Sequence, residues 1–204
     1  LSPRELAESY LEVARALTLA GRAVRGSHFE LENRKDRPIM RTYAIVNRKG
    51  GVGKTTVAAG ISAILDRCQV CRLALWDEEG PYIVPMSYGY RWDEGGLKLY
   101  FHCAGEGRKL DALRRDPRAA FEMDADYAVV GAESACGYTC TYRSVTGMGT
   151  LRVVESPQEA CDALTCLMRR QTGKEFSFTP ALLGRVCVLC LDVRSVCGKS
   201  NCPV

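Results

Sequence analysis

The feature that most restricts the fold of this chain is a series of short apolar segments separated by tight turns. Three segments in its first half read as strands: Cys71–Leu75, Tyr82–Tyr90 and Leu97–Cys103. The turn-forming sequences DEEG at 77–80 and WDEGG at 92–96 separate them. Parallel strands need long crossovers, so strands this closely spaced favour antiparallel pairing. The pattern predicts an antiparallel barrel or meander, and Pro85 places its strand at a sheet edge or a bulge.

The remainder of the chain continues the β pattern and adds helices. Four more segments read as strands: Ala119–Met123, Tyr127–Val130, Tyr138–Val154 and Val186–Val193. Helices are expected at Leu110–Arg115, and at Ser156–Gly173 behind a serine cap and a proline at the first helical position. An amphipathic helix is expected at Ser2–Gly26, where an S-x-x-E capping box begins it. We therefore expect a mainly β (α+β) fold. Its expected parts are a helical extension and linker at 1–38, a strand–loop–helix insertion at 39–63, and a barrel at 64–204.

One strand leads directly into a candidate anion site. After Leu97–Cys103, Gly105 and Gly107 form a turn, and Arg108 and Lys109 stand at the start of the next helix. Backbone N–H groups, the helix dipole and two cations converge at such a helix start. His102 lies on the strand that leads in. The segment therefore predicts binding of a phosphate or another anion.

A second phosphate motif competes with this one. The sequence KGGVGKTT follows a short apolar strand, Tyr43–Val46, and precedes a helical segment. A strand, a glycine-rich loop and a helix form the context of a P-loop, in which Lys54 would reach the β/γ-phosphates of ATP and Thr55 would hold magnesium. The candidate nucleotide-binding residues are Lys49, Gly51, Gly53, Lys54, Thr55 and Thr56. Residues 40–64 resemble the start of ParA/MinD-type partitioning ATPases. No suitable Walker B strand follows; the nearest apolar run that ends in aspartate is Leu189–Asp192.

Charge and cysteine content exclude several classes of protein. A net charge of +4 without a long basic run argues against a nucleic-acid partner. No apolar run reaches membrane-spanning length, so no membrane association is expected. The odd number of cysteines, 11, indicates reduced thiols and a cytoplasmic location. Both C-x-x-C pairs lie in apolar strand-like runs, where positions i and i+3 point to opposite faces, so no metal site is expected.

Four longer segments carry a resemblance to a known family. They are PYIVPMSYGY, LYFHCAGEGRKLDALRRDPRAAFEMD, YRSVTGMGTLRVVES and VLCLDVRSVCGKSN, within residues 64–201. In order and spacing they resemble the pyridoxamine 5′-phosphate oxidase-like flavin split barrels, and within them the nitroimidazole-resistance (Nim) group. The resemblance implies a six-stranded antiparallel split barrel with flanking helices. It also implies a homodimer that binds FMN between its subunits.

The same resemblance implies roles for individual residues. Arg108 and Lys109 match the cations that bind the FMN phosphate. The segments that line the flavin are matched by Ser87, Tyr88, Tyr142 and Ser144. His102 matches a histidine near the flavin that donates to a substrate nitro or carbonyl group, or shuttles a proton.

The implied function is an FMN-dependent oxidoreductase that transfers electrons to a small substrate such as a nitroaromatic compound. Two alternatives remain: a P-loop ATPase or nucleotide switch that uses ATP and magnesium, and a non-catalytic flavin- or heme-binding protein. Heme and the deazaflavin F420 are alternative cofactors, because the fold by itself does not decide the chemistry.

Overall fold

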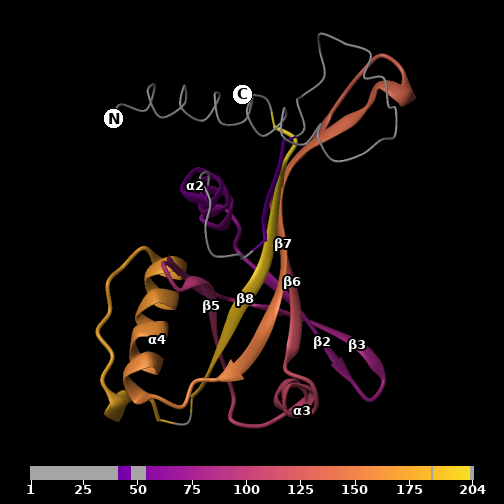
Figure 1. The fold of residues 1–204 in the computed structure, drawn as a ribbon. Helices are drawn as coiled ribbons and strands as arrows, with labels where there is room; N and C mark the ends of the chain where they lie inside the picture. The colour runs from indigo at the N-terminus through magenta and orange to yellow at the C-terminus, as the bar shows by residue number, and fades with distance from the viewer. Residues whose placement is uncertain (1–40, 47–53, 185, 203–204) are drawn as a thin grey trace.

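The computed structural model describes residues 41–46, 54–184 and 186–202, with side chains from residue 60 onward within those ranges (Figure 1). The helix expected at Ser2–Gly26 and the residues Lys49, Gly51 and Gly53 lie outside them. The strands are β1 (Arg41–Val46), β2 (Cys71–Asp77), β3 (Gly80–Met86), β4 (Gly89–Asp93), β5 (Gly96–Cys103), β6 (Arg118–Val130), β7 (Thr139–Val153) and β8 (Cys187–Ser200). The helices are α2 (Lys54–Leu65), α3 (Arg108–Arg115) and α4 (Pro157–Thr172), with short 3₁₀ turns at Ala135–Gly137 and Pro180–Leu182.

All the described strands belong to one sheet in the order β3-β2-β6-β7-β8-β5-β4, and β1 also pairs with β8. Strand β8 is long enough to pair with β7 along one edge and to share its other edge between β5 and β1. Figure 1 shows β6, β7 and β8 running side by side through the molecule, with α2 and α4 on one side of them. Every described pairing is antiparallel, which confirms the expected pairing mode.

The two ends of the sheet order are adjacent in sequence. Strands β3 and β4 are the end strands, and only Ser87 and Tyr88 connect them. The sheet must therefore curve until its ends come close together, which produces a split barrel. Pro85 lies in the end strand β3, where a proline is tolerated, and the predicted edge position is confirmed.

The core follows the two-residue period of the strands. Leu73, Leu99, Phe121 and Leu191 are buried toward the barrel interior, where Ile61 and Leu65 of α2 join them. A second cluster lies on the opposite face of β5 and β8, where α4 packs; it contains Tyr100, Val154, Ala160, Ala163, Leu164, Val188 and Cys190. Ser156 accepts a hydrogen bond from the Glu159 amide and Gly173 ends the helix in the left-handed conformation, so α4 has both expected caps.

Several expectations about the elements need correction. The described sheet has eight strands rather than six, because the 82–90 segment divides at Ser87 and because β1 adds to β8. The two segments expected at 119–123 and 127–130 form one strand, β6, whose pairing with β7 shifts between Ala125 and Ala128. The last strand continues to Ser200 rather than ending at Val193.

The segment assigned to an insertion at 39–63 pairs and packs with the barrel. Its β1 pairs with residues 195–200 of β8, and Ile61 of its helix α2 is fully buried in the core. The described residues before 64 therefore pack together with the barrel rather than forming a separate unit.

The cysteines are all present as free thiols. Burial raises the pKa of Cys68 to about 11 and that of Cys190 to about 12, so both stay protonated at neutral pH. Among the described residues no group of three His, Cys, Asp or Glu side chains could hold a metal ion. None of the described helices is both long and apolar enough to span a bilayer.

Candidate functional site

The predicted anion site lies where β5 ends and α3 begins. Gly107 precedes the helix with φ of 119°, and no side chain caps it. The first backbone amides that donate within α3 are those of Leu110 and Asp111, both to the carbonyl oxygen of Gly107. The amides of Arg108 and Lys109 are therefore free to donate to an anion at the helix N-terminus.

Arg108 lies at this helix start, but acidic side chains hold it. Its guanidinium donates to Asp77 at 2.5 Å and to Glu79 at 3.0 Å, and it lies 4.6 Å from the centre of the Tyr82 ring. The hydrogen bond from Arg108 lowers the pKa of Asp77, which keeps this carboxylate charged. A shallow hollow of about 540 Å³ surrounds these groups, and Glu78 and Asp111 also line it. The sequence assigned Arg108 to a phosphate; the structure pairs it with the β2–β3 turn.

Lys109 is placed differently. Within the described part of the chain it forms no ion pair, and its side chain is half-buried. Its ammonium acts on Cys103, whose Cα partner across the β5–β8 ladder is Cys187. Burial first, and then the neighbouring Cys187 thiol, raise the pKa of Cys103, while Lys109 lowers it. Among the described residues Lys109 is therefore a cation without an ion-pair partner that lies near the Cys103 thiol.

His102 and Ser87 lie close to this end of β5. His102 is exposed and lies opposite Val188. Because Phe101 and Cys103 face the barrel interior, His102 points to the opposite face of the sheet. Strand β4 begins at Gly89, which pairs with Tyr100, so exposed Ser87 lies just before β4, at the end of the β4–β5 ladder nearer His102. His102 and the Cys103 thiol, on which Lys109 acts, point to opposite faces of the sheet.

Tyr88 has a structural position. Its side chain is fully buried, and its hydroxyl donates to the carbonyl oxygens of Leu65 at 2.6 Å and Cys68 at 3.2 Å. Leu65 ends helix α2, so Tyr88 satisfies carbonyls that the helix leaves without partners. Arg170 donates to the same two carbonyls and lies 5.4 Å from the centre of the Tyr88 ring. Tyr88 is thus a core residue rather than one that faces a ligand.

We expect the variant Tyr88→Phe to distinguish a structural role of Tyr88 in the core from a role in flavin binding. Removing the hydroxyl should lower the free energy of unfolding by about 0.5–1.5 kcal/mol, because its hydrogen bonds are lost while Arg170 still donates to both carbonyls. Thermal unfolding measured by circular dichroism should show a melting temperature lower by a few degrees. Flavin affinity should be unchanged. If the variant keeps its stability but loses flavin, Tyr88 belongs to the flavin-binding site and does not have a purely structural role.

Tyr142 and Ser144 lie at the far end of the long strands. Both are half-buried on β7, and Ser144 pairs with Lys199 of β8. His102 pairs with Val188 of the same strand. At about 3.3 Å per residue, the part of β8 from Val188 to Lys199 extends for up to roughly 35 Å. One chain therefore does not bring Tyr142 and Ser144 to His102 or Lys109.

The P-loop motif is not confirmed. Lys54, Thr55 and Thr56 form the first turn of α2, but their side chains lie outside the described part of the structure. The strand before them, β1, pairs antiparallel with β8. A P-loop belongs to a parallel sheet built from βα units, and the described pairings contain no parallel pair.

Sequence reasoning did not identify two features of this region. One is the acidic β2–β3 turn that binds Arg108, and the other is the Cys103–Cys187 pair. The complementary charges of DEEG at 77–80 and RKLDALRR at 108–115 were a signal for the first. For the second, no local signal exists, because cross-strand partners are set by register.

A family model described as "Pyridoxamine 5′-phosphate oxidase" matches residues 58–199. A search of curated proteins gives no significant match.

Solved structures share the fold. A proposed 5-nitroimidazole antibiotic resistance protein from Bacteroides thetaiotaomicron is 26% identical, with a TM-score of 0.61 over 85% of this chain and 96% of that one. The FAD and heme binding protein from Mycobacterium smegmatis is 23% identical, with a TM-score of 0.59 over 79% of this chain and 75% of that one. The flavocytochrome Anf3 from Azotobacter vinelandii is 18% identical, with a TM-score of 0.58 over 79% of this chain and 71% of that one.

Proposed function

The chain belongs to the pyridoxamine 5′-phosphate oxidase family, and on that premise we propose that it is an FMN-binding oxidoreductase acting on a small substrate. The observation that carries the proposal is the start of α3. There an uncapped helix N-terminus lies together with Lys109, which forms no ion pair within the described part of the chain. A phosphate needs this combination of backbone donors and a fixed cation.

The residues around Lys109 fit a flavin phosphate. The amides of Arg108 and Lys109 would donate to its oxygens, and the Lys109 ammonium would balance its charge. Arg108 contributes indirectly, because its bonds to Asp77 and Glu79 fix the β2–β3 turn against the helix. Bound flavin would supply the redox chemistry, while the protein orients it and excludes water.

The same proposal includes a homodimer. Tyr142 and Ser144, far from Lys109 in one chain, are available to complete the flavin site of a second copy. His102, exposed on the face opposite the Cys103 thiol, would then hold or donate a proton at a nitro or carbonyl oxygen of the substrate. Light scattering should give twice the mass of the chain. If the protein binds FMN while it is a monomer, Tyr142 and Ser144 are not part of the flavin site.

The similarity to the Bacteroides protein favours a nitroaromatic substrate. The protein should therefore transfer electrons from reduced flavin to a 5-nitroimidazole under anaerobic conditions, with the flavin spectrum returning to its oxidised form. If the reduced flavin is reoxidised by other acceptors but not by the 5-nitroimidazole, the protein binds flavin but nitroaromatic compounds are not its substrates.

The absorption spectrum of the purified full-length protein tests the cofactor itself. We expect visible flavin bands, either directly or after addition of FMN, and release of FMN on denaturation. If FAD is released instead, the cofactor of this protein is FAD and not FMN. A Soret band without flavin would favour the heme-binding alternative. Protein that is colourless and takes up neither cofactor would refute the proposal.

A further inference from the structure

Two half-buried cysteines, Cys103 and Cys187, lie opposite each other at one end of the β5–β8 ladder. Cys103 is the last residue of β5, Cys187 is the first residue of β8, and the two are Cα partners in the antiparallel register. Both side chains pack against the barrel core, so they point to the same face of the sheet. Residues that are directly opposed on one face of an antiparallel pair have adjacent side chains. The two thiols therefore face each other across the ladder.

The backbone spacing at this pair fits a disulfide bond. Directly opposed residues of antiparallel strands have Cα atoms about 4.5 Å or about 5.5 Å apart, depending on the type of pair. Disulfides span Cα separations of about 4.4–6.8 Å, so either type of pair lies within their range. A bond between the two sulfur atoms therefore needs little movement of the backbone.

The position of the pair at the end of the ladder gives the backbone room for this movement. After Cys103 the chain leaves β5 for the helix start at Gly107, and it reaches Cys187 from the segment that follows the 3₁₀ turn Pro180–Leu182. The described register contains no β5–β8 pair beyond these two cysteines. The two strand ends can therefore approach each other without breaking a further ladder pair on that side.

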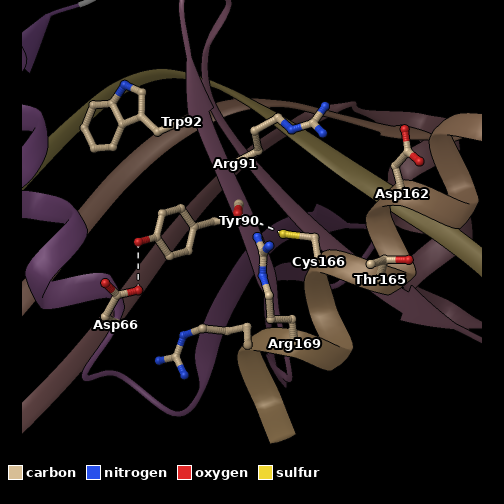
Figure 2. Close-up of a pocket in the computed structure, with 9 residues that line it drawn as sticks. Asp66, Tyr90, Arg91, Trp92, Asp162, Thr165, Cys166 and Arg169 are labelled. Atoms are coloured by element: carbon tan, nitrogen blue, oxygen red, sulfur yellow. Dashed lines mark hydrogen bonds between the residues drawn. The ribbon is translucent and has the colours of Figure 1, made fainter. Parts of the chain in front are cut away.

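In the described strand pairings no other cysteine has a cysteine as its Cα partner. Cys68 and Cys71 are close in sequence, but both side chains are 0% exposed, so a dissolved oxidant does not reach them. Figure 2 shows a third case, Cys166 in the groove between β4 and α4. Its thiol donates to the Tyr90 carbonyl oxygen at 2.9 Å, and the described lining of this groove contains no second cysteine. The pair at the end of the β5–β8 ladder therefore combines a directly opposed thiol with partial exposure.

We propose that oxidised glutathione, or another small-molecule disulfide, converts Cys103 and Cys187 into a reversible disulfide bond. In the first step the Cys103 thiolate attacks one sulfur of oxidised glutathione, forms a mixed disulfide and releases one glutathione thiolate. In the second step the Cys187 thiolate attacks the Cys103 sulfur, and the second glutathione thiolate leaves. The two cysteines lose two protons and two electrons, which both pass to the two molecules of reduced glutathione. The bond ties β5 to β8 just before α3 begins. It needs no bound flavin, so it is independent of the proposed function.

Lys109 makes Cys103 the thiol that reacts first. Burial and then the Cys187 thiol raise the pKa of Cys103, but the Lys109 ammonium acts in the opposite direction and lowers it. Within the described residues Lys109 forms no ion pair, so its charge is available to stabilise a thiolate. The thiolate is the nucleophile in disulfide exchange. Cys103 is therefore the attacking cysteine, and Cys187 completes the bond.

Peptide mapping of the full-length protein tests the proposal without any substitution. The protein is equilibrated with mixtures of oxidised and reduced glutathione, its free thiols are alkylated, and it is digested with trypsin. Cys103 and Cys187 then lie in separate peptides, 99–108 and 186–194. Excess oxidised glutathione should give these two peptides joined by a disulfide, with fragmentation spectra that place the bond on Cys187 rather than Cys190. Excess reduced glutathione should separate them. Absence of the joined peptides while the exposed Cys136 carries glutathione would overturn the proposal.

Single substitutions test the order of the two steps. Cys187→Ser should trap glutathione on Cys103, because the second step is lost, whereas Cys103→Ser should leave Cys187 with little glutathione. The opposite pattern would reverse the assigned order of attack. Cys166→Ser removes a half-buried thiol from the β4–α4 groove, so it is the matched control and should form the joined peptides as the wild type does.

Thermal unfolding gives an independent readout of the bond. Oxidation should raise the melting temperature of the wild type by about 4 °C or more, because the disulfide closes a long loop of the unfolded chain. Cys103→Ser should show no such rise. A rise of equal size in Cys103→Ser would mean that a different disulfide forms, and it would overturn the proposal.

Discussion

Replacing Lys109 by alanine should lower FMN affinity by about ten- to a hundred-fold. A hydrogen bond to a charged group contributes about 1.5–3 kcal/mol, and each 1.4 kcal/mol corresponds to roughly a factor of ten. Within the described structure Lys109 has no carboxylate partner, so its whole charge is available to a phosphate. Equilibrium dialysis or flavin fluorescence would measure the change. Stability should be little affected, because no ion pair is lost.

Arg108→Ala provides the comparison on the same helix turn. Asp77 and Glu79 already balance the Arg108 guanidinium, so FMN affinity should fall by less than about three-fold. Arg114→Ala, further along α3, should leave it unchanged. Tight FMN binding by Lys109→Ala together with flavin loss in Arg108→Ala would show that Arg108 leaves its carboxylates to bind the phosphate.

Substituting Gly149 by alanine should destabilise the protein by about 3 kcal/mol. A Cβ atom at this position would lie 2.1 Å from the Asp192 carbonyl oxygen and 2.9 Å from the Val193 Cα. Gly149 lies where the β7–β8 register shifts, in the middle of the longest strand pair. Both contacts are with backbone, which can relax only by displacing β8, and such overpacking costs about 1–3 kcal/mol or more.

The corresponding fall in melting temperature is about 6–12 °C for a chain of this size, measured by calorimetry. Gly131→Ala is the control, because its Cβ would meet only the Tyr138 ring at an ordinary 3.7 Å. It should change the free energy of unfolding by less than about 0.5 kcal/mol. Equal stability of the two variants would mean that β8 shifts freely at Asp192 to make room for the added methyl group.

Local signals predicted most of the elements. Turn sequences at 77–80 and 92–96 separate β2 from β3 and β4 from β5, and Pro85 marks an edge strand. Ser156, Pro157 and Gly173 delimit α4. These features depend on residues within a few positions of each other, so the sequence carries them completely. The segments that resemble a flavin split barrel also identified the family that the match over residues 58–199 shows.

The arrangement of the site needed contacts between distant residues. Arg108 and Lys109 are neighbours in sequence and equal in charge, but only Arg108 meets the carboxylates of the β2–β3 turn. His102 and Cys103 are also neighbours, yet they face opposite sides of the sheet. Which face and which partner each side chain has depends on strand register, and register is set by the packing of the whole sheet.

The sequence by itself determined most of the strands, the caps of α4, the family and the glycine-opened helix start at Arg108. Only the tertiary structure decided which residues share a site: it buried Tyr88 in the core, separated Tyr142 and Ser144 from Lys109 along β8, and brought two distant thiols together across the β5–β8 ladder. The reason is physical. Capping and turn formation are interactions between near neighbours, whereas burial and charge pairing depend on which distant segments the closed sheet brings together.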